Sequence, residues 1–201
     1  MQRYDCLKAI AGEVGDALVV SAGWAAREWQ ALRPGDGNFR PRTLGLASSI
    51  GLGIALGLPH RKVIVIDGDG AFLMNLCGLP TIAWQNPPNL IHLLFDNQCY
   101  EASGASETAT IAGTDAVALA QGAGYRHACW VKGPKEFREE FLKAWKRNGL
   151  GFIAVKVEQG QPELPPIGMD EVENKYHFIR YVEATEKKNI LGPSDHRKGL
   201  K

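Results

Sequence analysis

Runs of aliphatic residues without polar alternation recur along the chain and predict strands that are covered on both faces. The clearest run is Val63-Ile64-Val65-Ile66, which is β-branched throughout. Comparable runs predict further strands at residues 17–20, 90–95, 125–131 and 150–157. Strands of this kind are typical of a parallel sheet that lies between two layers of helices.

Helical patterns fill the intervals between these strands. Leu7, Ile10, Ala11 and Val14 recur at the spacing of one helix face and predict an amphipathic helix near the start. Further helices are expected at residues 24–32, 44–57, 71–84, 115–123, 134–148 and 172–182. This alternation of strands and helices predicts an α/β fold, a doubly wound and mainly parallel sheet with helices on both faces.

One domain accounts for most of the chain. Its 201 residues are enough for a single α/β domain with a substantial core. We expect this domain to span residues 1–184, with a loop at 97–112 and a linker at 162–166. Residues 185–201 are rich in charge and predict a mobile tail.

Charge and cysteine content exclude several classes of protein. The formal net charge of +1 argues against binding nucleic acid or an anionic membrane through bulk charge. No apolar run approaches the roughly 20 residues of a membrane span, and the charged N-terminus lacks a signal-peptide core. Cys6, Cys77, Cys99 and Cys129 form no CxxC pair, which argues against iron–sulfur and structural zinc sites. We therefore expect a cytoplasmic protein with reduced thiols.

Polar residues follow two of the predicted strands. Gly68-Asp69-Gly70 comes directly after the strand that ends at Ile66, and Asp96-Asn97 follows the strand at 90–95. Consecutive parallel strands emerge at one edge of a sheet, so Asp69 and Asn97 should face one another there. A carboxylate and an amide oxygen are ligands that Mg²⁺ accepts, and the glycines allow backbone N–H groups to approach a phosphate. The pattern therefore predicts a metal–diphosphate site.

The spacing of these motifs is specific enough to suggest a family. Gly68-Asp69-Gly70, with Asn97 lying 27 positions after Gly70, resembles the diphosphate- and metal-binding motif of thiamin-diphosphate-dependent enzymes. Leu44-Gly45, 23 positions before Gly68, is similar to the family segment in which a bulky apolar residue supports the bent cofactor. Most of the chain resembles the sulfopyruvate and phosphonopyruvate decarboxylases of this family, with counterparts at residues 23–28, 45–51, 67–70, 97–104 and 173–180.

The resemblance implies the diphosphate-binding domain of the thiamin-diphosphate-binding fold, with thiamin diphosphate and Mg²⁺ as cofactors. It implies Mg²⁺ ligands from the Asp69 carboxylate, the Asn97 side-chain oxygen and the main-chain carbonyl of Cys99. The backbone N–H of Ala71 is expected to bind a phosphate oxygen, and the backbone at residues 42–44 to hold the aminopyrimidine. The expected cofactor-binding residues are Leu44, Gly45, Gly68, Asp69, Gly70, Ala71, Asn97, Cys99 and Tyr100.

Two segments depart from the family pattern. Many relatives have a serine or threonine near the diphosphate where this chain has Trp24-Ala25-Ala26. The Asn-Gln-Pro-Thr loop of the sulfopyruvate and phosphonopyruvate enzymes is replaced by residues 105–108, where Glu107 would repel an anionic substrate. Asp67 and His92, by contrast, are expected to have structural roles within or beside buried strands.

The family also implies a partner. Its activating glutamate lies on a separate pyrimidine-binding domain, for which this chain has no room, so no catalytic residue is expected here. We expect one half of a split decarboxylase whose partner α subunit carries that domain, in a hetero-oligomer with at least two copies of each chain. Its substrate is expected to be a small 2-oxo acid that yields CO₂ and an aldehyde. A carboligase subunit of the acetolactate-synthase type and a non-catalytic relative remain alternatives, whereas scattered cysteines disfavour a 2-oxo acid:ferredoxin oxidoreductase subunit.

Overall fold

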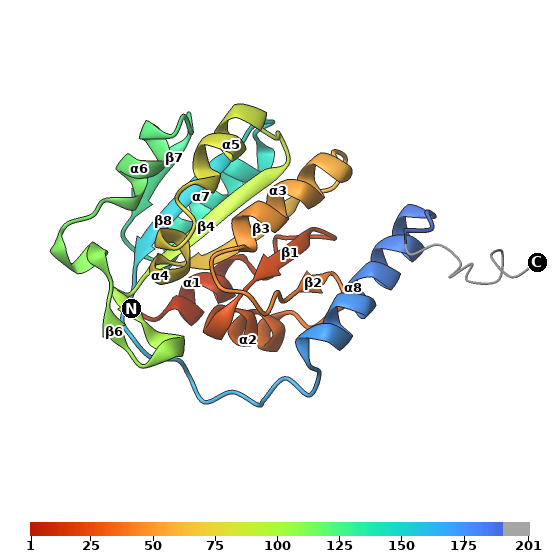
Figure 1. Cartoon of the computed structure of the whole chain (residues 1–201), viewed down its shortest axis with the longest axis horizontal. Helices are drawn as coiled ribbons and strands as arrows, with labels where there is room; N and C mark the ends of the chain where they lie inside the picture. The colour runs from red at the N-terminus through yellow and green to blue at the C-terminus, as the bar shows by residue number, and fades with distance from the viewer. Residues whose placement is uncertain (191–201) are drawn as a thin grey trace, which may run out of the picture.

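The computed structural model describes residues 1–190 and contains a six-stranded parallel sheet in the order β2-β1-β3-β4-β8-β7 (Figure 1). Its strands are β1 (Leu18–Ser21), β2 (Asn38–Phe39), β3 (Val63–Gly68), β4 (Leu90–Asp96), β7 (Ala128–Val131) and β8 (Gly151–Lys156). Each pairing in this sheet is parallel. The predicted α/β fold with a doubly wound, mainly parallel sheet is confirmed.

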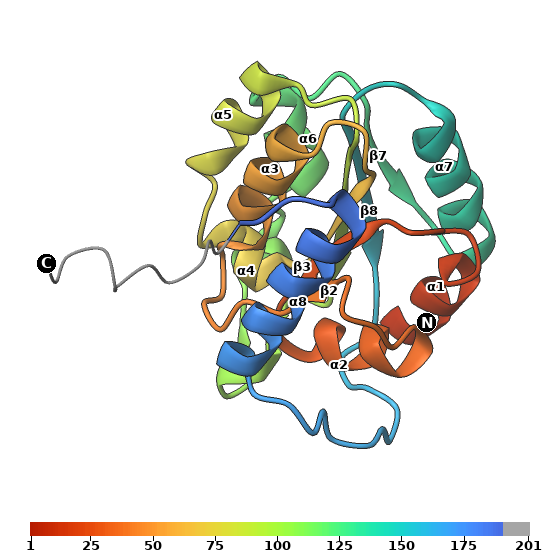
Figure 2. The same cartoon turned by 90° about the vertical axis from the view of Figure 1, so that its right-hand side faces the viewer.

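Helices cover both faces of the sheet (Figure 2). One face carries α1 (Arg3–Ile10), α2 (Gly23–Leu32) and α7 (Pro134–Lys146), and the other carries α3 (Ala47–Gly57), α5 (Gly78–Gln85) and α6 (Ala116–Gly122). Successive residues of a strand pack in alternation into the cores on the two faces of the sheet. In β3, Ile64 and Ile66 join the core under α1, α2 and α7, and Val63 and Val65 join the core under α3, α5 and α6. Burial on both sides explains why these strands show no polar alternation.

The strands β3 and β4 end side by side. Their register pairs Asp67 with Leu94 and Gly68 with Phe95. Asp69 then begins the short helix α4 (Asp69–Leu73), and Asn97 follows the last residue of β4. The two polar motifs therefore leave the sheet at the same edge, as the sequence predicts.

The predicted helix from Ala71 to Trp84 is wrong in one respect, because the structure divides it into α4 and α5. The chain turns at residues 74–77. Within this turn the Asn75 amide Nδ2 donates a hydrogen bond to the Ser49 hydroxyl of α3 at 2.9 Å. A Cβ added at Gly78 would lie 3.1 Å from the same amide. The absence of a side chain at Gly78 therefore lets the turn pack closely.

The predicted loop at residues 97–112 contains regular structure. It holds a small antiparallel pair of strands, β5 (Cys99–Tyr100) and β6 (Ser106–Glu107). Two 3₁₀ turns accompany this hairpin, η1 (Glu101–Ser103) and η2 (Ala109–Ala112). Strands of two residues leave no hydrophobic periodicity, so the sequence pattern could not predict them.

The helix α8 (Glu171–Glu186) packs on the β2 edge of the sheet (Figure 2). Its Phe178 and Val182 form a small third core with Leu18 and Leu58. The helix continues two residues beyond the predicted domain boundary at residue 184, and residues 191–201 of the predicted tail lie outside the described residues. Across residues 1–190, no helix is long and apolar enough to cross a membrane.

Candidate functional site

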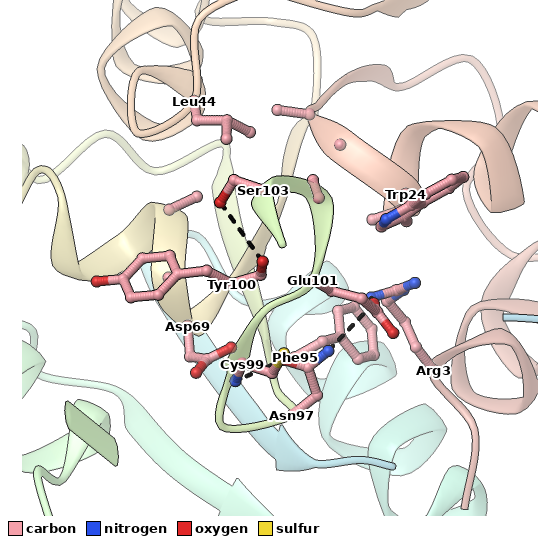
Figure 3. A pocket seen from close by; sticks show the side chains of 17 residues that line it. Arg3, Trp24, Leu44, Asp69, Phe95, Asn97, Cys99, Tyr100, Glu101 and Ser103 are labelled. Atoms are coloured by element: carbon pink, nitrogen blue, oxygen red, sulfur yellow. Dashed lines mark hydrogen bonds and ion pairs between the residues drawn. The ribbon is translucent and has the colours of Figure 1, made fainter. Parts of the chain in front are cut away.

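A cleft opens at the carboxyl edge of the sheet (Figure 3). Eight of the nine predicted cofactor-binding residues line it, namely Leu44, Gly68, Asp69, Gly70, Ala71, Asn97, Cys99 and Tyr100. The ninth, Gly45, packs against α4, and a Cβ added to it would be 3.3 Å from the Ala71 carbonyl oxygen. Segments that are distant in the sequence thus meet at one place.

The Asp69 carboxylate is buried at the floor of this cleft, with 1% of the residue exposed. Its Oδ2 accepts a hydrogen bond from the Thr108 hydroxyl, and Thr110 Oγ1 lies 3.2 Å from the same oxygen. Its Oδ1 is buried and has no hydrogen-bond partner among residues 1–190. Burial raises the pKa of the Asp69 carboxyl and the neighbouring Asp96 raises it further, whereas the Thr108 and Thr110 hydroxyls and the Asn97 backbone N–H lower it. A buried carboxylate oxygen without a donor is a natural ligand for a cation.

The Asn97 amide is held in a fixed orientation beside Asp69. Its Oδ1 accepts a hydrogen bond from the Cys99 backbone N–H at 3.1 Å, and its Nδ2 donates to Glu101 Oε2 at 3.2 Å. No cluster of three or more His, Cys, Asp or Glu side chains suited to a metal occurs in residues 1–190. The predicted set of one carboxylate, one amide and one main-chain carbonyl instead fits Mg²⁺, which takes few protein ligands and several from phosphate and water.

Glycines shape the wall of the cleft. A Cβ added at Gly70 would lie 2.5 Å from Cδ1 of Tyr100, so the tyrosine ring packs directly on the glycine backbone. Gly45 has a φ of +82°, which favours glycine, and a Cβ there would be 3.0 Å from the Met74 Cβ. The turn that carries Leu44 therefore depends on Gly45 to reach α4.

Arg3 and Glu28 were not predicted to have a role at the site. Arg3 of α1 lines the cleft and binds the fully buried Glu28 of α2 through Nε at 2.9 Å and Nη2 at 2.8 Å. Its Nη1 lies 3.7 Å from Glu101, which also accepts a hydrogen bond from the Gly160 backbone N–H. Figure 3 shows Arg3, Glu101 and Trp24 on the side of the cleft away from Tyr100. A glutamate one position from Trp29 on the buried face of α2 is the signal that could have revealed this pair.

Thr108 and Thr110 were also missed as contacts of Asp69. Both come from the segment after the hairpin, at the start of and within η2. Their hydroxyls are buried, although threonine in a loop is usually exposed. Their positions in the sequence carry no sign of this, because the contact depends on how the hairpin folds back.

The departures from the family pattern lie at different distances from the site. Trp24 and Ala25 line the cleft, while Glu107 is exposed on β6 and does not line it. Asp67 and His92 are buried, and a hydrogen bond of 3.2 Å joins Asp67 Oδ2 to His92 Nε2, which agrees with the structural roles expected for them. Arg27, which follows the Trp24-Ala25-Ala26 segment, donates hydrogen bonds to the main-chain carbonyls of Leu164 and Pro165.

Known proteins resemble this chain in sequence and in fold. Residues 20–155 match the family of thiamine pyrophosphate enzymes, C-terminal TPP binding domain. The chain is 37% identical over 191 residues to the sulfopyruvate decarboxylase subunit beta of Methanothermobacter thermautotrophicus, a match that covers 92% of this chain and 98% of that one. It is 34% identical over 180 residues to the sulfopyruvate decarboxylase of Methanosarcina acetivorans, covering 89% of this chain and 46% of that protein.

A solved structure supports the fold independently. The benzoylformate decarboxylase of Polynucleobacter necessarius superimposes with a TM-score of 0.66 at 21% identity, covering 83% of this chain and 34% of that one. The family match spans β1 to β8 and so includes every segment that lines the cleft except the start of α1. The chain therefore belongs to the thiamine pyrophosphate enzymes, in which it corresponds to the C-terminal domain that binds the cofactor.

Proposed function

We propose that this chain is the diphosphate- and Mg²⁺-binding subunit of a split thiamin-diphosphate-dependent 2-oxo acid decarboxylase. The observation that carries the proposal is Asp69 Oδ1, a buried oxygen that has no hydrogen-bond partner among the described residues and lies beside Asn97 at adjacent strand ends (Figure 3). The proposed Mg²⁺ ligands are this carboxylate, the Asn97 side-chain oxygen and the Cys99 main-chain carbonyl. Phosphate and water oxygens are expected to complete the octahedron.

The backbone around Asp69 suits the phosphate end of the cofactor. Gly68 and Gly70 have no side chains, so the N–H of Ala71 is open to a phosphate oxygen in this proposal. Leu44, held by the Gly45 turn, is proposed to support the bent cofactor, and Tyr100 to flank it. These residues bind and orient, whereas bound thiamin diphosphate supplies the electron sink for the loss of CO₂ from a 2-oxo acid.

A partner subunit is proposed because, among the described residues, the cleft offers no free carboxylate. Among the described residues, the carboxylates that line it are Asp69 and Glu101. The first is assigned to the cation, and the second is engaged by Asn97 and Gly160. We propose that a pyrimidine-domain α subunit supplies the activating glutamate, in an assembly with at least two of each chain. The M. acetivorans relative, of which this chain covers 46%, is long enough to contain such a second half.

The proposed substrate is a small 2-oxo acid with a second anionic group, such as sulfopyruvate or phosphonopyruvate. Arg3 is the one cationic side chain from the described part of the chain that lines the cleft. It already faces two carboxylates, Glu28 and Glu101, and so leaves no net positive charge for a sulfonate or phosphonate. We therefore propose that the partner subunit supplies the cation that binds this group.

An assay of the reconstituted enzyme tests the proposal. The chain is co-purified with its partner, and CO₂ release is measured from sulfopyruvate, phosphonopyruvate and pyruvate with thiamin diphosphate and Mg²⁺. We expect turnover by the complex and none by the chain alone. Turnover by the chain alone would refute the split architecture. Cofactor binding by the complex without CO₂ release from any of these acids would refute the proposed decarboxylase activity. Product analysis with an added aldehyde distinguishes carboligation from decarboxylation.

We also propose a cytoplasmic location, because the four cysteines are free thiols.

A further inference from the structure

Two buried threonine hydroxyls lie at one oxygen of the Asp69 carboxylate. Thr108 and Thr110 are 2% and 3% exposed, so their hydroxyls are shielded from solvent. Thr108 Oγ1 donates to Asp69 Oδ2, and Thr110 Oγ1 lies 3.2 Å from the same oxygen. The other oxygen, Oδ1, has no hydrogen-bond partner in the described part of the chain. Protein contacts thus treat the two carboxylate oxygens unequally.

The same hydroxyls connect Asp69 to the neighbouring strand. Thr110 Oγ1 donates to Asp96 Oδ1 at 2.8 Å and lies 2.8 Å from Thr108 Oγ1. Asp96, which is fully buried, also accepts hydrogen bonds from the Gln98 backbone N–H and from Lys156 Nζ. A continuous chain of polar contacts therefore runs from Asp69, beyond β3, through two hydroxyls to the end of β4.

We infer that Thr108 and Thr110 are positioning residues that reserve Asp69 Oδ1 for the cation, an inference that rests on the proposed function. The terminal torsion of an aspartate rotates broadly when nothing restrains it. A free Asp69 carboxylate could then present either oxygen, or both, to a metal ion. The Thr108 hydroxyl holds Oδ2 and is itself in contact with the Thr110 hydroxyl, so Oδ1 is left for the cation in a single orientation.

The arrangement also fixes the wall of the cleft. The hairpin β5–β6 begins just after Asn97, a proposed cation ligand, and ends just before Thr108, which contacts the proposed ligand Asp69. Between them Tyr100 packs on Gly70. Because the hydroxyls tie the end of the hairpin to Asp69, they hold the wall and the cation ligand in one arrangement.

Paired variants separate positioning from packing. Thr108→Val keeps the shape of the side chain and removes the hydroxyl, Thr108→Ser keeps the hydroxyl, and Thr81→Val changes an exposed threonine of α5 as a control. Each variant is co-purified with the partner subunit, and Mg²⁺ is titrated calorimetrically at saturating thiamin diphosphate. Groups that orient a metal ligand typically contribute about 10–100-fold to metal affinity. We expect a loss in that range for Thr108→Val, and affinities within about two-fold of the parent for the serine and control variants.

The possible results lead to distinct conclusions. Parent-like Mg²⁺ affinity in Thr108→Val overturns the positioning role, and so does an equal loss in Thr108→Ser, since packing would then be the cause. If Thr108→Val does not fold, Thr110→Val and Thr110→Ser are compared in the same titration, and equal affinities overturn the inference. A parent complex that binds neither Mg²⁺ nor thiamin diphosphate instead overturns the proposed function.

Discussion

Among residues 1–190, Arg3 is the only cation paired with the buried carboxylate of Glu28, and replacing it with methionine removes this partner. Glu28 is completely buried and Arg3 is 6% exposed, and two hydrogen bonds of 2.9 and 2.8 Å join them. Breaking a buried ion pair by removing one partner typically costs about 3–5 kcal/mol, because the other charge stays buried without compensation. We expect Arg3→Met to lower the free energy of unfolding by about that amount.

A surface pair in the same chain provides the control. Arg138 of α7 binds Glu13, and their side chains are 45% and 32% exposed. Such pairs contribute about 0–1 kcal/mol, so Arg138→Met should have little effect. The double variant Arg3→Met/Glu28→Leu should recover most of the lost stability, because apolar replacement of both partners is often neutral.

Equilibrium urea denaturation of the full-length chain measures all three variants. The midpoint shift at constant m-value gives the change in the free energy of unfolding. If Arg3→Met costs no more than Arg138→Met, or if the double variant is as unstable as the single one, the reasoning about the uncompensated charge is refuted.

Three further outcomes are expected. Gly70→Ala places a methyl group 2.5 Å from Cδ1 of Tyr100 and should weaken thiamin diphosphate binding by displacing that ring, and Tyr100→Ala in the same chain should restore part of the affinity in a cofactor titration. Burial raises the pKa of Cys6 to about 12, so at pH 8 a thiol reagent should label the exposed Cys77 quickly and Cys6 only in denaturant. Hydrogen bonds from the Ala118 N–H, the Trp130 side chain and the Val117 N–H lower the pKa of Asp115. The Asp115 carboxylate therefore contributes fully to the stability of the fold above its unfolded-state pKa of 3.8, and this contribution is lost as the pH falls through the lower pKa of the folded state. Asp115→Asn should therefore flatten the acid limb of a plot of stability against pH.

The parts of the fold that could be predicted are those that repeat a pattern. The strand of Val63 to Ile66 is buried on both faces, and such burial leaves a signature in every residue. The meeting of Asp69 and Asn97 follows from topology, because consecutive parallel strands end at one edge. The position of Leu44 beside them came from resemblance to a family and not from periodicity.

The parts that could not be predicted depend on contacts between distant segments. Thr108 reaches Asp69 only because the hairpin folds back, and its residues carry no regular pattern. Arg3 lies at the start of α1, where an arginine ordinarily faces solvent, and its role depends on Glu28 in another helix. The break between α4 and α5 lies where Asn75 contacts Ser49 of another helix. Each of these requires the folded neighbour to be known.

Binding of thiamin diphosphate to the complex of this chain and its partner, with and without Mg²⁺, tests the central claim most directly. Calorimetry should show saturable uptake by the parent complex that requires Mg²⁺, because Asp69 Oδ1 is left without any other partner. Asp69→Ala should abolish the Mg²⁺-dependent uptake while leaving the complex assembled. Equal affinity in the parent and the Asp69→Ala complex, or uptake that does not respond to Mg²⁺, would contradict the assignment of this cleft.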